Sequence, residues 1–386
     1  MIKYIVSTSI AVVAALVIAV VMLSLPTAGI GEMAPAGSKF VVVVNSSIQG
    51  PIQSSLEQYV SDLEAEGYSV TIYATEGGTP EDLRAFLQGQ LSDGLAGCIL
   101  IGDLPVPWYE MDDDFHGHAE FPIDLYYMDL DGAWIDSDGD GKYDGHFDGS
   151  GDREPEIWVG RLTASPLTGD EATLLQNYFA KNHGYRTGEL SLNNRALNYV
   201  DDTWIYYPEW YQGLECAYSD VTIVKDPATT TASDYKNRLA ENYEWIQVMA
   251  HSRSCCRHRF EENGNWSYVY SSDIRSIDAK AFFYNLYSCS ACCYVETDYI
   301  GGWYVFADTY GLAAIGSTKI GGMRDFGDFY APLGEGKSLG QSFKEWFIGQ
   351  SPYGLTERQW FYGMTLLGDP TLKPLAATYS PNLTQA

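Results

Sequence analysis

A continuous apolar run, Phe40-Val41-Val42-Val43-Val44, restricts the fold of this chain more than any other feature. Successive side chains of a strand point to opposite faces, so five apolar residues in a row need burial on both faces. That requirement is met in a parallel sheet covered by helices. Ile52, Leu56, Val60 and Leu63 then recur at helical spacing, and they predict the first covering helix.

The same alternation continues along the first half. Val70-Thr71-Ile72-Tyr73 predicts a second strand, and Thr79-Pro80 supplies an N-cap and a first-turn proline for a second helix. Cys98-Ile99-Leu100-Ile101 predicts a third strand. The pattern β-α-β-α-β indicates an open, mostly parallel α/β sheet.

A long acidic stretch from Gly102 to Glu156 shows no clear periodicity, and we expect it to be irregular. A strand at 157–160 and a helix from Asp170 to Lys181 follow. The second half repeats the alternation of strands and helices. We therefore expect two packed subdomains, residues 38–185 and 195–375, with a tail at 376–386.

The N-terminus resembles an export signal. Lys3 precedes an apolar run from about Ile5 to Leu25, and the small residues Pro26-Thr27-Ala28-Gly29 follow. A run of roughly 20 apolar residues could also remain in the bilayer as an anchor. Residues 1–37 therefore predict a secreted or extracellular protein, with the cleaved and the membrane-anchored forms both open.

The charge balance restricts the partners. The chain carries 51 acidic and 23 basic side chains, a formal net charge of -28. Such a surface repels phosphate backbones, so we expect no nucleic-acid binding.

His251 and Cys289 are the candidate catalytic pair. His251 directly follows the apolar strand ending at Ala250, and Cys289 stands three residues after the strand ending at Leu286. Residues just past the carboxyl ends of neighbouring strands line the crevice of an open α/β sheet. The imidazole can take the thiol proton and return it to a leaving amine, while the backbone N–H groups of Ser252 and Cys289 stabilise the oxyanion.

Several short segments together resemble the gingipain-like family of cysteine peptidases, which has the caspase-type α/β fold. The resemblance covers about Phe40 to Leu372. It rests on Ile99-Leu100-Ile101-Gly102-Asp103, Asp124-Leu125-Tyr126-Tyr127, Val159-Gly160-Arg161, Ala250-His251-Ser252, Ser288-Cys289-Ser290 and Gly368-Asp369-Pro370-Thr371-Leu372.

The resemblance implies an endopeptidase acting on proteins or peptides, with Cys289 as nucleophile and His251 as general acid and base. It implies Asp124 as the acid that orients the histidine. Asp152 lies nine residues before Arg161, a spacing similar to that of the acid lining the specificity pocket in arginine-cleaving gingipains, so Arg or Lys at the cleaved position is an expectation. Ser252 departs from the family, where glycine usually follows the histidine.

A run of alternating aspartates predicts a structural calcium site, because hard carboxylate oxygens around a glycine turn select calcium. The loop lacks the glutamate that closes an EF-hand, since its twelfth position is Phe147. The candidate ligands are Asp136, Asp138, Asp140, Lys142 and Asp144.

The seven cysteines leave alternatives open. Cys255 and Cys256 follow the candidate histidine, and Cys292 and Cys293 follow the candidate nucleophile. The two clusters could form a disulfide after export, hold zinc, or act as a redox motif. The main alternative to a peptidase is an inactive, calcium-stabilised exported binding protein on the same fold. A second alternative is a metal-thiolate or redox protein built on the two cysteine clusters.

Overall fold

The computed structural model describes residues 37–252, 255–262 and 264–374. The predicted export signal therefore lies almost wholly outside the described residues. Within them, no helix is both long and apolar enough to cross a bilayer.

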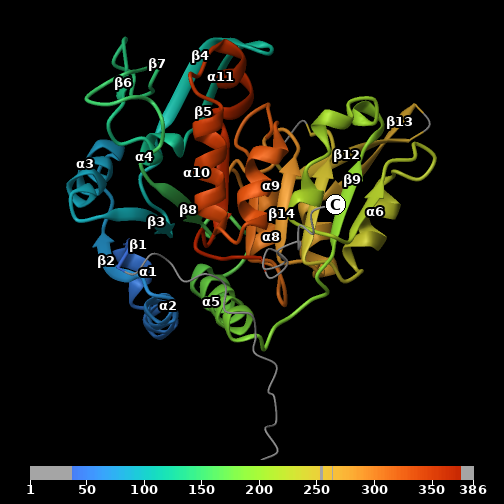
Figure 1. Ribbon diagram of the computed structural model, residues 1–386, viewed down its shortest axis with the longest axis horizontal. Coiled ribbons are helices and arrows are strands. Elements are labelled where there is room, and N and C mark those ends of the chain that lie inside the picture. The colour runs from blue at the N-terminus through green and yellow to red at the C-terminus, as the bar shows by residue number, and fades with distance from the viewer. Residues whose placement is uncertain (1–36, 253–254, 263, 375–386) are drawn as a thin grey trace, which may run out of the picture. The chain divides into compact units, whose positions relative to one another are not determined.

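One ten-stranded sheet forms the centre of the described chain (Figure 1). Neighbouring strands run parallel except for β15 and β16, which are antiparallel. The mixed α/β class with a mostly parallel sheet is thus confirmed. In spatial order the strands are β10 (Val221–Val224), β9 (Ala196–Val200), β11 (Trp245–Met249), β14 (Phe283–Tyr287), β15 (Ala313–Ser317), β16 (Met364–Gly368), β8 (Trp158–Leu162), β3 (Leu95–Ile101), β1 (Lys39–Asn45) and β2 (Ser69–Thr75).

Helices bury both faces of this sheet. One hydrophobic cluster contains residues of α1 (Ser46–Gln49), α2 (Gln53–Ala65), α5 (Glu171–Thr187), α6 (Ala232–Leu239), α7 (Ser271–Ile277) and α8 (Ile300–Val305). The other contains residues of α3 (Pro80–Leu91), α4 (Leu125–Met128), α9 (Phe326–Gly334), α10 (Leu339–Gly349) and α11 (Leu355–Phe361).

The apolar run of β1 is explained by this arrangement. Phe40, Val42 and Val44 join the cluster under α2, whereas Val41 and Val43 join the cluster under α3. All five residues are completely buried. Alternate residues of one strand therefore serve two separate cores, as the sequence predicted.

The acidic stretch from Gly102 to Glu156 is more ordered than expected, and the prediction of an irregular segment was wrong. It contains two antiparallel hairpins, β4 (Trp108–Asp114) with β5 (Gly117–Pro122) and β6 (Ala133–Ile135) with β7 (Gly145–Phe147). β6 and β7 have only three residues each, and β4 ends in a run of three aspartates, so the period-two signal is weak.

The second half adds one further hairpin and three short 3₁₀ turns. The hairpin joins β12 (Arg257–Glu262) to β13 (Asn265–Tyr270) and lies outside the large sheet. The turns are η1 (Asp202–Trp204), η2 (Pro208–Trp210) and η3 (Leu214–Cys216). Of these, η1 follows β9 directly and reaches the candidate site.

The two predicted halves contribute strands to the same sheet. β16, from the end of the chain, lies between β15 and β8, and Leu367 pairs with Arg161 of β8. The backbone therefore connects the halves by β pairing.

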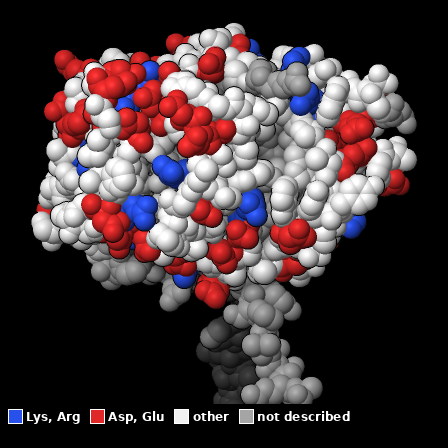
Figure 2. All heavy atoms as spheres, turned by 90° about the horizontal axis from the view of Figure 1, so that it is seen from above, with Lys and Arg blue, Asp and Glu red and all other residues white. Residues whose placement is uncertain are grey.

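The acidic character of the sequence is visible on the surface. Figure 2 shows Asp and Glu side chains gathered over one part of the face that it presents, with few Lys and Arg side chains among them.

Two glycines give a matched test of the packing between β3 and β8. A Cβ at Gly97 would overlap the indole of Trp158, whereas a Cβ at Gly89 in α3 meets nothing within 4 Å. We expect Gly97→Ala to lower the free energy of unfolding by about 1–3 kcal/mol through overpacking. Gly89→Ala should raise it by roughly 0.5–1 kcal/mol through helix propensity. Urea unfolding measures both, and equal effects of the two substitutions would contradict this packing.

Candidate active site

The pairing of β11 with β14 brings His251 and Cys289 to one edge of the sheet. The strands run parallel with Met249 opposite Tyr287, and the N–H of Ala250 donates to the Tyr287 carbonyl at 3.0 Å. His251 and Cys289 each stand two residues beyond that last pair. The structure therefore places the candidate base and nucleophile at the carboxyl ends of adjacent strands.

The His251 imidazole is held by the turn that follows β9. Its Nε2 lies 2.8 Å from Thr203 Oγ1, and its ring centroid lies 4.4 Å from that of Trp204. On another side Trp266 meets the ring edge-on at 5.2 Å. Thr203 therefore engages Nε2 and leaves Nδ1 as the ring nitrogen without this contact.

Burial, and then the charge of Arg259, lower the pKa of His251 to about 4. The imidazole is therefore neutral at pH 7 and able to accept a proton. A neutral base is the form that a thiol nucleophile requires.

The Cys289 segment makes a sharp turn directly after β14. Ser290 has a φ of 57°, in the left-handed region that non-glycine residues rarely adopt. Its N–H donates to the Lys319 carbonyl at 2.7 Å, and Ser288 Oγ lies 3.0 Å from His258 Nδ1. Both neighbours of Cys289 are thus fixed, while Cys289 itself is half-buried.

A pocket of about 410 Å³ opens beside this turn. Ser290 and Lys319 line one side, and the β4–β5 hairpin lines another with Glu120. Lys319 Nζ pairs with Asp114 Oδ1 at 2.7 Å, and both side chains are nearly inaccessible. Glu296 is the remaining acid of the lining. The pocket beside the nucleophile is therefore acidic, and its one lysine is already paired.

The model of peptidase family C25 matches residues 35–375, nearly the whole chain. The chain belongs to peptidase family C25. No curated protein and no solved structure matches it significantly. Membership of C25 makes the protein a cysteine peptidase by family, and the resemblance seen in the sequence is confirmed.

Asp124 does not lie where an acid that orients His251 would have to lie. Its carboxylate accepts from Arg161 Nη2 at 2.6 Å and from Nε at 3.1 Å, and it also accepts from Tyr294 and Thr365. The Arg161 guanidinium lies over the Tyr294 ring at 4.2 Å. Both oxygens are used in this buried ion pair, and none of the contacts described for Asp124 involves His251. The contact with the His251 imidazole that was expected of Asp124 is made by Thr203.

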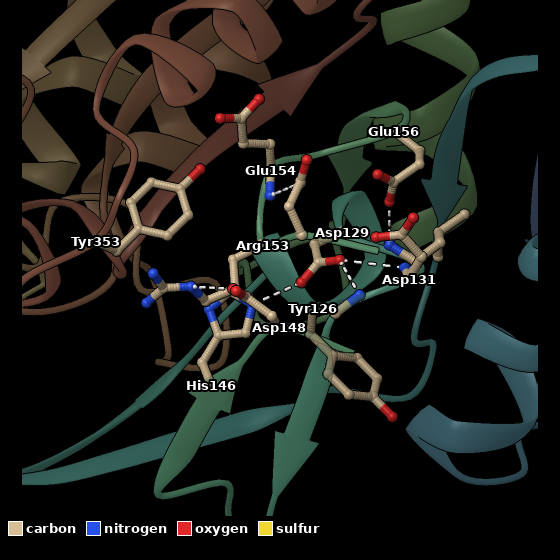
Figure 3. A network of polar contacts seen from close by, with 12 residues as sticks. Tyr126, Asp129, Asp131, His146, Asp148, Arg153, Glu154, Glu156 and Tyr353 are labelled. Carbon is tan, nitrogen blue, oxygen red and sulfur yellow. Dashed lines mark hydrogen bonds and ion pairs between the residues drawn. The ribbon is translucent and has the colours of Figure 1, made fainter. Parts of the chain in front are cut away.

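Asp152 lies in an acidic network outside the pocket beside Cys289. It is exposed, and its Oδ1 accepts the N–H of Glu154 at 2.7 Å. Its charge contributes to a raised pKa of Asp131, for which burial is the main cause. Figure 3 shows the network around Asp131. The lining of the pocket does not include Asp152.

The centre of this network is a group of three carboxylates, Asp129, Asp131 and Glu156, whose oxygens approach within 4.8 Å (Figure 3). Burial, followed by the charges of Asp129 and Asp131, raises the pKa of Glu156 to about 7. Asp129 is also 2.6 Å from His146 Nε2, and both side chains are completely buried.

The aspartate loop between β6 and β7 folds around its own carboxylates. Asp136 accepts the N–H groups of Gly139 at 2.7 Å and Gly141 at 2.9 Å. Asp140 accepts both the N–H and the ammonium of Lys142. Asp144 bonds to Ser137 instead, through Oγ at 2.9 Å. Asp138 and Asp140 approach Glu110 of β4 closely enough to share one cation.

All seven cysteines are free thiols in the structure. Cys255 and Cys293 line the same pocket, so one member of each cluster does reach the nucleophile turn. Cys255 Sγ lies 3.0 Å from Cys256 Sγ, and burial raises the pKa of Cys255. Among the described residues, no group with metal-binding spacing contains a cysteine.

Two substitutions distinguish the group that orients His251 from a structural acid. Thr203→Val removes one hydrogen bond worth about 1 kcal/mol, so kcat on a fluorogenic peptide should fall about fivefold with the melting temperature unchanged. Asp124→Asn leaves Arg161 buried without its counter-charge and should cost about 3–5 kcal/mol of stability, measured by urea unfolding. A stable Asp124→Asn protein that has lost turnover would instead restore Asp124 as the orienting acid.

Proposed function

We propose that this C25 peptidase is an endopeptidase that uses Cys289 as nucleophile and His251 as general base and acid. One observation carries the proposal: the register of β11 and β14 brings these two residues to the same sheet edge. The neutral imidazole and the fixed turn around Cys289 support it.

The chemistry follows from these two side chains. His251 Nδ1 takes the thiol proton, and the thiolate sulfur forms a bond to the substrate carbonyl carbon. As the tetrahedral intermediate collapses, the C–N bond breaks and the imidazolium returns the proton to the leaving amine. Water, deprotonated by His251, then hydrolyses the thioester and releases the acid and the thiol.

The backbone N–H groups of Ser252 and Cys289 are the proposed oxyanion donors. Both belong to segments that leave the sheet at the same edge as the catalytic pair. Ser252 is buried, with 7 % of its surface exposed.

Proteins or peptides are the substrates that the family implies. We propose a preference for Arg or Lys at the cleaved position, because Glu120 and Glu296 line the pocket beside Ser290. A carboxylate in such a pocket forms a charge-assisted pair with a basic side chain. These two acids are closer candidates than Asp152, which lies with the carboxylates of Figure 3.

Export is also part of the proposal. The apolar N-terminal run supports export. A separate part of the proposal is that the protein does not bind nucleic acid, which its net charge of -28 supports.

A panel of fluorogenic peptides with Arg, Lys, Asn or Asp at the cleaved position tests the activity in reductant. We expect cleavage after Arg or Lys that is abolished in Cys289→Ala, because Cys289 is the thiol that the β11–β14 register brings to the same sheet edge as His251. Glu296→Gln should weaken the preference for basic residues and leave the protein folded. Cleavage that persists in Cys289→Ala would contradict the assignment of Cys289 as the nucleophile. No cleavage at all, with an unreactive Cys289, would favour an inactive binding protein.

We also propose calcium at the aspartate loop. Asp136, Asp138 and Asp140 supply carboxylates at alternate positions, and Lys142 can offer only its main-chain carbonyl, as position seven of such loops does. The Lys142 ammonium already neutralises part of this group, since it lies 2.7 Å from Asp140 and 3.1 Å from Glu120. A bound calcium ion would have to displace that side chain.

Calcium added after chelation should raise the melting temperature. At a calcium concentration 100 times the dissociation constant, the free energy of unfolding should increase by about 2.7 kcal/mol. Sodium chloride at equal ionic strength is the control, since screening alone stabilises so acidic a chain. Asp138→Asn should abolish the calcium-specific part. Identical melting curves in calcium and in sodium chloride would exclude the site.

A further inference from the structure

The short strand β12 crosses the ends of three strands of the large sheet. β9, β11 and β14 are neighbours in that order, and β12 belongs to a separate hairpin beside them (Figure 1). We call β12, residues Arg257–Glu262, the strap. Its contacts follow the order of the strand ends beneath it.

Two contacts of the strap hold the segments of the catalytic pair. Arg259 and His251 exchange both backbone hydrogen bonds, at 2.8 and 3.1 Å. One residue earlier, His258 Nδ1 lies 3.0 Å from the hydroxyl of Ser288, the residue before Cys289. The strap is therefore connected both to the base and to the nucleophile turn.

A third contact holds the far end of the strap. Asp201 is the first residue after β9, and its own N–H donates to the Met249 carbonyl at 3.0 Å. Its Oδ1 accepts the N–H of Glu261 at 3.1 Å. Asp201 thus connects the strap to β9 and β11.

Both side chains that hold the strap are completely buried. Asp201 Oδ2 and His258 Nε2 have no hydrogen-bond partner within the described structure. Burying polar atoms in this way costs stability, so the core alone gives no reason for an acid and a histidine here. Burial raises the pKa of Asp201 to about 7 and lowers that of His258 to about 3.

We propose that Asp201 and His258 are positioning residues, which hold the strap across the strand ends and so fix the separation between His251 and Cys289. The inference rests on the proposed peptidase function. It assigns a role to two buried groups that the chemistry itself does not use.

Matched variants separate positioning from folding. Asp201→Ala removes the acceptor for Glu261, whereas Asp201→Asn keeps an oxygen there. His258→Leu keeps a similar volume without the bond to Ser288, and replacing a buried polar group by an apolar one does not require a loss of stability. Asp202→Asn is the control, because the Asp202 carboxylate bonds to Thr230 and not to the strap.

We would measure kcat and KM per active site, with the sites counted by a thiol-directed label. Asp201→Ala and His258→Leu should lower kcat about tenfold or more with KM within about twofold, since small misplacements of reacting groups are costly. Asp201→Asn and Asp202→Asn should stay near the wild type. Unchanged kcat in folded Asp201→Ala and His258→Leu overturns the proposal, as does a loss of activity that only follows the loss of labelled sites.

Failure of the proposed function is a separate outcome. If the wild type cleaves no peptide, iodoacetamide alkylation of Cys289 over a pH range, followed by peptide mass, reports the coupling of the thiol to His251. The strap then predicts that Asp201→Ala and His258→Leu change the alkylation rate several-fold while Asp202→Asn does not. Equal rates in all variants would reject it.

Discussion

The parallel pairing of β11 with β14 is the constraint on which the site depends. A parallel register fixes which residues stand level at the strand ends, and a shift by one residue would turn each side chain to the opposite face. Burial on both faces of the sheet prevents such a shift, because every position of these two strands is buried. The positions of His251 and Cys289 are therefore set by the cores on either side of the sheet, because each residue lies only two positions beyond the last paired residue of its strand.

The sequence was sufficient for most strands of the sheet, though not for β10 and β16, and for the two residues that leave it at this edge. Phe40 to Val44 could only be a strand buried on both faces, and His251 and Cys289 were recognisable because each follows an apolar strand. Thr203 could not be recognised in this way, since it lies in a 3₁₀ turn without periodicity and reaches His251 only because β9 pairs with β11. The pairing of Asp124 with Arg161 was equally hidden, since spacing along the chain does not reveal which charges meet across a core.

Charge in this protein is distributed in two different ways. Asp124 and Arg161 neutralise each other inside the fold, as do Asp114 and Lys319 beside the pocket. Glu296 has no such partner cation among the described ion pairs, although it shares the pocket with Ser290. The paired acids inside the fold thus maintain the architecture, whereas Glu296 at the pocket is the acid available to a positively charged ligand.

The strap has a consequence for the order of folding. Its three attachment points, Asp201, His251 and Ser288, lie just past the ends of β9, β11 and β14, which are far apart in the chain. Contacts between distant segments form only after the intervening loops have closed. The proposed base and nucleophile, His251 and Cys289, therefore reach their final separation after the central strands have assembled. Under the proposed mechanism, a newly made chain that is still incompletely folded lacks that geometry and is therefore unable to cut itself or its neighbours during synthesis.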